Sequence, residues 1–154
     1  MNCPCDLGSE SGRAYEACCA PFHAGQEPPD APTLMRSRYS AFARGQWAYL
    51  ARTLHQDHPD ASLSPRVFRE RLDKHAKRTR YRGLRILDRA PADDDGVARV
   101  LFHVSMMIAG KDASFVELSS FVHEGAGWRY LTGVTRAPRA VGDLSALDIA
   151  RFGA

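Results

Sequence analysis

The sequence predicts an α+β fold in which a small metal-binding segment precedes three helices packed on one antiparallel sheet. Three observations support this fold class. All four cysteines lie within the first 19 residues, the apolar residues that follow recur at helical spacing, and the second half of the chain contains alternating β-rich segments separated by short turns. Helices followed by such a meander cover one face of the sheet.

The cysteines all belong to the N-terminal segment, residues 1–25. One pair flanks a proline and the other pair is adjacent at the end of a short helix expected over residues 13–19, so four sulfurs can converge on one ion. Zinc takes tetrahedral sets of thiolates, and the metal would supply the folding energy that so small a segment lacks. The predicted zinc ligands are Cys3, Cys5, Cys18 and Cys19.

Two other states of these thiols stay open at this point. Two disulfides are one alternative, although a bond between the adjacent Cys18 and Cys19 would be strained and a cytosolic location keeps thiols reduced. Free or redox-active thiols are the other. His23 is the substitute ligand nearest in sequence, and whether it contributes to the metal site is left open.

Three helices are predicted between this segment and the sheet. A Pro-rich linker over residues 26–33 ends at Thr33, which is expected to cap the first helix, and Gly45 ends that helix. Ser64 is expected to cap the third helix after a break that contains proline. The expected helical ranges are 33–45, 46–55 and 65–79.

Four β-rich segments then predict an antiparallel meander, over residues 81–90, 97–110, 113–124 and 128–136. In the third segment, the face with Val116 and Leu118 is the more apolar and is expected to face the core. Glu117 lies on the opposite face, where it is either exposed or within a partly polar cavity. The tail is expected to add a short amphipathic turn. The predicted divisions are therefore 1–25, 26–33, 34–137 and 138–154.

The composition is that of an ordinary soluble domain. Hydrophobic residues make up 44% of the 154 residues and charged residues 25%, which allows a packed core without disulfides. The net charge of +3 is too small to indicate nucleic-acid binding by itself. The sequence shows neither a secretory signal pattern nor a long apolar run, so we expect a cytosolic protein that does not contact a membrane.

The N-terminal pattern resembles the SEC-C motif, a short zinc module found at the C-terminal tail of the translocase ATPase SecA and in many other bacterial proteins. The loop between the two cysteine pairs is about four residues longer here, which adds little to the cost of closing it. The matching positions are Cys3, Pro4, Cys5, Gly8 or Gly12, Arg13, Tyr15, Cys18 and Cys19.

Further segments are similar to the YchJ family of bacterial proteins. They are LMRSRYSAF (34–42), YLARTLH (49–55), ELSSF (117–121) and GWRYLTG (127–133). That family pairs an N-terminal SEC-C module with a domain like nuclear transport factor 2, a cystatin-like α+β roll. The resemblance implies structural zinc and a roll in which three helices pack on a curved antiparallel sheet, and it implies no reaction. We expect no second, C-terminal module of the kind found in some relatives, because no cysteine follows Cys19 in the sequence.

A roll of this kind encloses a pocket between its helices and its sheet, where a ligand could bind. Arg36 and Tyr39 lie three apart on one helix and could bind an anion there, and the alternative is that Arg36 pairs with Glu117. Glu117 and His103 are candidates for acid–base roles, although structural histidines are commoner. The predicted pocket residues are thus Arg36, Tyr39, Glu117 and His103, and no catalytic residue is assigned.

Positive charge is concentrated between Arg66 and Arg85, where nine basic residues accompany two acidic ones. This excess predicts either a solvated helix face or a surface for an acidic protein, the ribosome or RNA. We call its central members the basic patch: Arg69, Lys74, Lys77, Arg78, Arg80 and Arg82.

Two functional hypotheses follow. The preferred one is a cytosolic zinc-containing adaptor that engages a protein or ribosomal partner through its N-terminal segment and basic patch. The alternative is a small-molecule binder or acid–base enzyme that uses the pocket of the roll. RNA binding is a weaker third possibility, because no aromatic residues interleave with the charges. The sequence contains no phosphate loop, dinucleotide fingerprint or nucleophile elbow.

Overall fold

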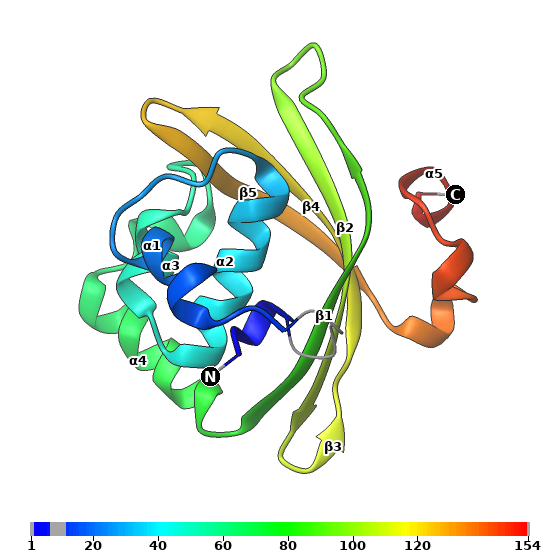
Figure 1. Ribbon diagram of the computed structural model, residues 1–154, viewed down its shortest axis with the longest axis horizontal. Coiled ribbons are helices and arrows are strands. Elements are labelled where there is room, and N and C mark those ends of the chain that lie inside the picture. Colours follow the sequence, from blue (N-terminus) through cyan, green and yellow to red (C-terminus); the bar gives the residue numbers. More distant parts are fainter. Residues whose placement is uncertain (1, 7–11, 154) are drawn as a thin grey trace.

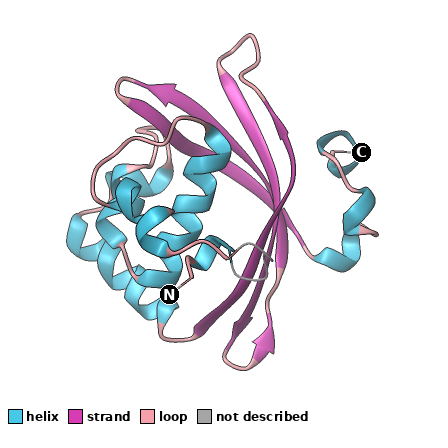
Figure 2. Ribbon diagram, viewed as in Figure 1, coloured by secondary structure: helices cyan, strands magenta, loops and turns pink. Residues whose placement is uncertain are grey.

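The computed structural model describes residues 2–6 and 12–153, and these residues form a curved antiparallel sheet with helices on one face (Figures 1 and 2). The predicted α+β fold class is confirmed. The helices over the sheet are α1 (Ala20–His23), α2 (Ala31–Arg44), α3 (Trp47–Arg52) and α4 (Pro65–Ala76), and α5 (Ile149–Phe152) lies on the other side.

Helix α2 is the longest helix of the described residues and begins earlier than expected. Asp30, not Thr33, is its N-cap: the Asp30 carboxylate accepts a 2.8 Å hydrogen bond from the Thr33 backbone N–H. Pro32 fits the first turn, where its missing N–H leaves no hydrogen bond unmade. Gly45 ends the helix in the left-handed conformation, with φ of 71°, as its position predicted.

The other two predicted helices are also present, in shorter form. Ser64 caps α4 by accepting a hydrogen bond from the Val67 N–H, as expected. Helix α4 ends at Ala76 rather than at residue 79, because Thr79 already belongs to the first strand. Directly after helix α3 the backbone is hydrogen-bonded to the sheet, because the Tyr130 N–H donates to the Thr53 carbonyl over 2.8 Å. This hydrogen bond fixes the end of α3 against the last strand.

The four predicted strands are confirmed in the order β1-β2-β4-β5, with every neighbouring pair antiparallel. They are β1 (Thr79–Ala90), β2 (Val97–Ile108), β4 (Phe115–Glu124) and β5 (Gly127–Arg136). A two-residue strand, β3 (Lys111–Asp112), extends the turn after β2. Strand β1 is therefore the edge strand on the side where the N-terminal segment packs.

Both faces of the sheet are covered, which corrects the expected orientation of β4. The face with Phe121 belongs to the main core under the helices. Val116 and Leu118 lie on the opposite face, where Leu147 and Phe152 of the C-terminal tail pack against them. The more apolar face of β4 is thus buried by the tail rather than by the helices (Figure 1). When both faces of a strand are covered, apolar and polar residues do not alternate clearly along it, so the sequence does not show which face the helices cover.

The C-terminal tail ends in the short helix α5, where the sequence predicted an amphipathic turn. Asp148 caps it, and the Ile149 N–H donates a 2.9 Å hydrogen bond to Asp88 on β1. Phe152 is 2% exposed and the Arg136 guanidinium lies 4.8 Å from its ring centroid. In the described part of the chain no helix is long and apolar enough to cross a membrane.

Candidate metal centre

Local backbone contacts bring the two cysteine pairs together. Cys3 precedes a 3₁₀ turn over Pro4–Asp6 that contains Cys5, and the Cys3 N–H donates to the Arg13 carbonyl over 2.7 Å. Asp6 accepts a 2.8 Å hydrogen bond from the Arg13 N–H, so both ends of the intervening loop are tied together. Cys18 and Cys19 follow a second 3₁₀ turn and lead into α1. Gly12 adopts φ of 45° beside this junction, and the motif glycine at position 8 lies outside the described residues.

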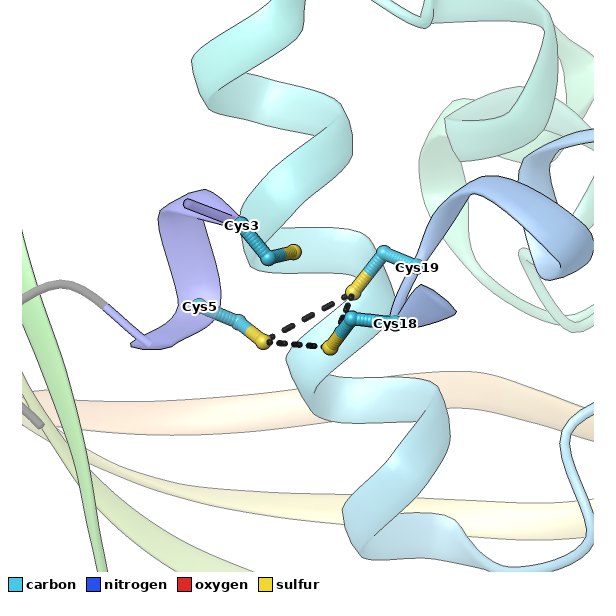
Figure 3. A group of neighbouring side chains, drawn as sticks. All are labelled: Cys3, Cys5, Cys18 and Cys19. Atoms are coloured by element: carbon cyan, nitrogen blue, oxygen red, sulfur yellow. Dashed lines mark hydrogen bonds between the residues drawn. The ribbon is translucent and has the colours of Figure 1, made fainter. Parts of the chain in front are cut away.

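The four sulfur atoms form a compact group (Figure 3), which we call the cysteine cluster. All four lie within 4.8 Å of one another. The Sγ–Sγ distances are 3.5 Å for Cys5–Cys18, 3.7 Å for Cys5–Cys19 and 3.9 Å for Cys18–Cys19. A tetrahedron with zinc–sulfur bonds of about 2.3 Å has edges of about 3.8 Å. The three distances among Cys5, Cys18 and Cys19 therefore fit one tetrahedral ion, with Cys3 within 4.8 Å as a fourth donor. All four cysteines are free of disulfides.

The electrostatics of the cluster favour a cation. Hydrogen bonds from neighbouring thiols, first from Cys19, lower the pKa of Cys5 to about 5. Burial, followed by its contact with Cys5, raises the pKa of Cys18 to about 12, and the contact with Cys5 likewise raises the pKa of Cys19. One thiol of the cluster therefore loses its proton easily, whereas deprotonation of a second or third thiol costs free energy. A divalent ion removes that cost, because it is attracted to every thiolate.

Helix α2 forms the floor of the cluster. Ser40 Oγ lies 3.2 Å from the sulfurs of both Cys3 and Cys19, and Cys19 Sγ approaches the Arg36 carbonyl at 3.8 Å. Cys3, Cys5 and Cys19 are buried in the same core as the helices. The N-terminal segment is therefore packed on the α+β roll, and an ion in the cluster would join the two.

Arg36 belongs to this junction. Its Nη1 donates to the Cys5 carbonyl over 3.3 Å and lies 3.7 Å from Asp6 Oδ1. Arg36 is therefore neither on the internal pocket nor paired with Glu117. Residues three apart lie near one another on a helix, so spacing alone did not separate Arg36 from Tyr39. The N-terminal segment covers the Arg36 side of α2, and its Cys5 and Asp6 hold the guanidinium.

His23 is held by two hydrogen bonds outside the cluster. Its Nε2 lies 2.8 Å from the Ser37 carbonyl, and its Nδ1 lies 2.6 Å from the Tyr15 hydroxyl. A carbonyl only accepts, so Nε2 carries the proton and Nδ1 accepts from Tyr15. Burial lowers the pKa of His23, in agreement with a neutral ring. With both nitrogens engaged, the ring ties α1 to α2 and offers no free ligand atom.

A cavity of about 250 Å³ lies between the helices and the sheet, as the predicted roll requires. Tyr39 and Glu117 line it, whereas His103 faces a different surface hollow. Arg38 also lines the cavity and is 6% exposed, a position that sequence reasoning missed. The sequence did carry a signal that Arg38 is buried: Arg38 follows Leu34 by four residues, so the two share one helix face, and Leu34 is buried.

The polar groups of the cavity are partly connected. Tyr130 OH donates a 2.9 Å hydrogen bond to Glu117 Oε2, and Ser119 Oγ donates to the same oxygen. Arg38 Nη1 donates to the Leu50 carbonyl over 2.9 Å and to Thr53 Oγ1 over 2.6 Å. Burial lowers the pKa of Arg38 to about 10, which leaves the guanidinium charged at neutral pH.

The basic patch lies on α4, on the turn after it and on the start of β1, and its six side chains are exposed. Arg69 pairs with Asp73 at 3.7 Å and lies over the Trp47 ring. The other five form no ion pair with any described residue. Arg82 also lines the hollow beside Cys5 and Arg36, so the basic patch reaches the edge of the cysteine cluster.

Comparison with known proteins agrees with this architecture. A family model described as the middle, nuclear-transport-factor-2-like domain of YchJ matches residues 30–133. The chain belongs to the YchJ family. A UPF0225 protein of Bordetella pertussis is 38% identical over 137 residues, which cover 87% of this chain and 92% of the relative. The UPF0225 protein YchJ of Shigella dysenteriae is 33% identical, over 85% of this chain and 81% of the relative.

Two solved structures of SEC-C motif-containing proteins share the fold of this YchJ-family chain. The crystal structure from Psychrobacter arcticus has a TM-score of 0.71 at 24% identity and covers 94% of this chain and 89% of its own. The solution structure from Rhodopseudomonas palustris has a TM-score of 0.68 at 26% identity and covers 87% of this chain and 98% of its own. The cysteine cluster therefore occurs in a chain whose structural neighbours carry the SEC-C motif.

Proposed function

We propose that the cysteine cluster binds one structural zinc ion and that the protein is an adaptor, which docks a negatively charged protein partner. Zinc is supported by four thiols within 4.8 Å of one another, a ligand set that leaves no position open for a substrate. The free state of the cysteines also supports a cytosolic location, where thiols stay reduced.

The observation that carries the adaptor role is the continuity between the cysteine cluster and the basic patch. Arg82 lies in both surface hollows, one beside Cys5 and one beside Lys77 and Arg78. Zinc binding would fix the N-terminal segment next to unpaired positive charges. An acidic surface that meets both would bind in a metal-dependent and salt-dependent manner.

A protein partner is favoured over single-stranded nucleic acid by the shortage of exposed aromatic rings. Among the described residues, Val134 is the sole large hydrophobic residue that is strongly exposed. Single-strand binding by non-specific proteins relies on stacking of bases on aromatic side chains. The basic patch offers charge without such a platform, which suits carboxylates on a protein surface, including that of a ribosomal protein.

The test is capture of partners from a bacterial extract, before and after nuclease treatment, by four forms of the protein. They are the wild type, Cys18→Ser, a charge reversal of Lys77, Arg78, Arg80 and Arg82 to Glu, and a control reversal of the exposed Arg89 and Arg139. We expect the same protein to bind the wild type and the control, to be lost with the other two, and to survive nuclease. Identical capture by all four forms would refute the proposal, and loss after nuclease would indicate RNA instead.

A further inference from the structure

We propose that the internal cavity of the roll binds a small, neutral, planar molecule that presents a hydrogen-bond acceptor next to an N–H donor, as an aromatic amide or a lactam does. The inference goes beyond the adaptor role and does not depend on it, because the cavity lies on the other side of α2 from the cysteine cluster. Three polar features of the wall carry the argument.

The first feature is a buried cation with unused donors. Arg38 is 6% exposed, and both of its hydrogen bonds leave from Nη1. Its Nε and Nη2 groups have no partner among the described residues, and no described carboxylate lies within ion-pair distance. The guanidinium lies 4.9 Å from the Tyr130 ring centroid, which holds its plane in place. The Nε and Nη2 groups are not closed off from solvent, and Arg38 lines the cavity, so an acceptor that enters the cavity can reach them.

The second feature is a carboxylate with an unused oxygen. Both hydrogen bonds to Glu117 reach Oε2, so Oε1 has no partner among the described residues. Glu117 and Arg38 line the same cavity without forming a salt bridge. A ligand that accepts from Arg38 and donates to Glu117 would satisfy both groups.

The third feature is the Tyr39 hydroxyl. Of the side-chain oxygens and nitrogens in the described chain that have no exposed surface, it alone makes no well-formed hydrogen bond, although the Gly83 backbone lies near it. Tyr39 itself lines the cavity. Elsewhere the wall is apolar, with Phe102, Val104 and Met106 from β2. A planar apolar body with polar groups at one end therefore matches the lining.

The charges of the wall and the volume of the cavity restrict the net charge and the size of the ligand. The wall already carries one positive and one negative group, so a neutral ligand keeps the cavity neutral, whereas an anion would lie close to Glu117. A dry cavity of about 150 Å³ holds benzene. The 250 Å³ here leaves room for a ring with a small substituent. His75, exposed on α4, and Tyr81 lie at the rim, where Tyr81 OH and His75 Nε2 are 3.3 Å apart.

The experiment compares four probes of similar size by titration calorimetry and NMR on the zinc-loaded, full-length protein. Benzamide has both the acceptor and the donor, benzoate has only the acceptor and a charge, benzylamine has only the donor and a charge, and toluene has neither. We expect benzamide to bind at least tenfold more tightly than each of the others. Shifted amide signals should lie on α2 and β4 around the cavity.

Two variants test the wall residues. Glu117→Gln keeps an oxygen for Tyr130 and Ser119 but turns the free oxygen into a donor, so benzamide should bind at least tenfold more weakly. Arg38→Met should have the same effect. Glu124→Gln on the same strand, outside the cavity, should bind benzamide like the wild type.

Three results would overturn the proposal. They are benzoate or toluene binding as tightly as benzamide, unchanged benzamide affinity in Glu117→Gln, and no binding of any probe at millimolar concentration. If Arg38→Met fails to fold, the probe series and Glu117→Gln still decide the matter.

Discussion

Replacing Cys18 by Ser tests the metal centre most directly. Cys18 is half-buried at one corner of the cluster, and its sulfur lies 3.5 Å from Cys5 and 3.9 Å from Cys19. A serine hydroxyl is a poor zinc ligand, so the substitution leaves three thiolates and an incomplete tetrahedron. The change in volume is small, and any loss of stability therefore reflects the metal rather than packing.

The expected magnitude follows from linkage and from the geometry. The sulfur spacings among Cys5, Cys18 and Cys19 are close to the edges of about 3.8 Å of a zinc–thiolate tetrahedron, so zinc would bind the folded chain with little rearrangement. At free zinc one hundred times the dissociation constant, binding to the native state alone adds about 2.7 kcal/mol. In a chain of this length that corresponds to a rise in Tm of roughly 5–10 °C.

The assay combines elemental analysis with thermal unfolding in buffered zinc and in chelator. The wild type should contain one zinc per chain and lose the rise in Tm in chelator, and Cys18→Ser should show neither zinc nor the rise. Ser40→Ala is the matched control, because Ser40 contacts Cys3 and Cys19 from α2 without being a predicted ligand. Metal-free wild-type protein after purification without chelator, or an equal rise in Tm for Cys18→Ser, would refute the reasoning.

Other substitutions test the sheet and its surroundings. Phe152→Ala should lower the free energy of unfolding by about 3–5 kcal/mol in denaturant titrations, because this buried ring covers the second face of the sheet. Val134→Ala is the control: because Val134 is exposed, the free energy of unfolding should change by less than about 0.5 kcal/mol. Gly133→Ala should cost about 1–3 kcal/mol and weaken benzamide binding, since a Cβ there would lie 2.6 Å from Glu117 Cδ; an unchanged affinity would contradict this. Burial lowers the pKa of His58, so the unfolded chain binds protons first and stability falls as the pH drops below about 6.5. His58→Asn should flatten that decline between pH 7.5 and 5.5, and parallel profiles would count against the assignment.

The sequence by itself determined the features that depend on local chemistry. Four cysteines in 19 residues predicted a cysteine cluster that could hold a metal ion, and the structure brings the four sulfurs within 4.8 Å of one another. Ser64 and Gly45 mark helix ends because a side-chain acceptor and a left-handed residue are needed at those points whatever packs nearby. The turn spacing likewise specified four antiparallel strands.

Only the tertiary structure decided which faces meet. Arg36 and Arg38 are two residues apart on α2, yet one contacts the N-terminal segment and the other lines the cavity. Helical periodicity separates the two faces but does not say which partner covers each, because both are buried by segments distant in sequence. Val116 and Leu118 face the tail for the same reason. Long-range packing, which no local pattern encodes, placed the buried Arg38 in the same cavity as Glu117.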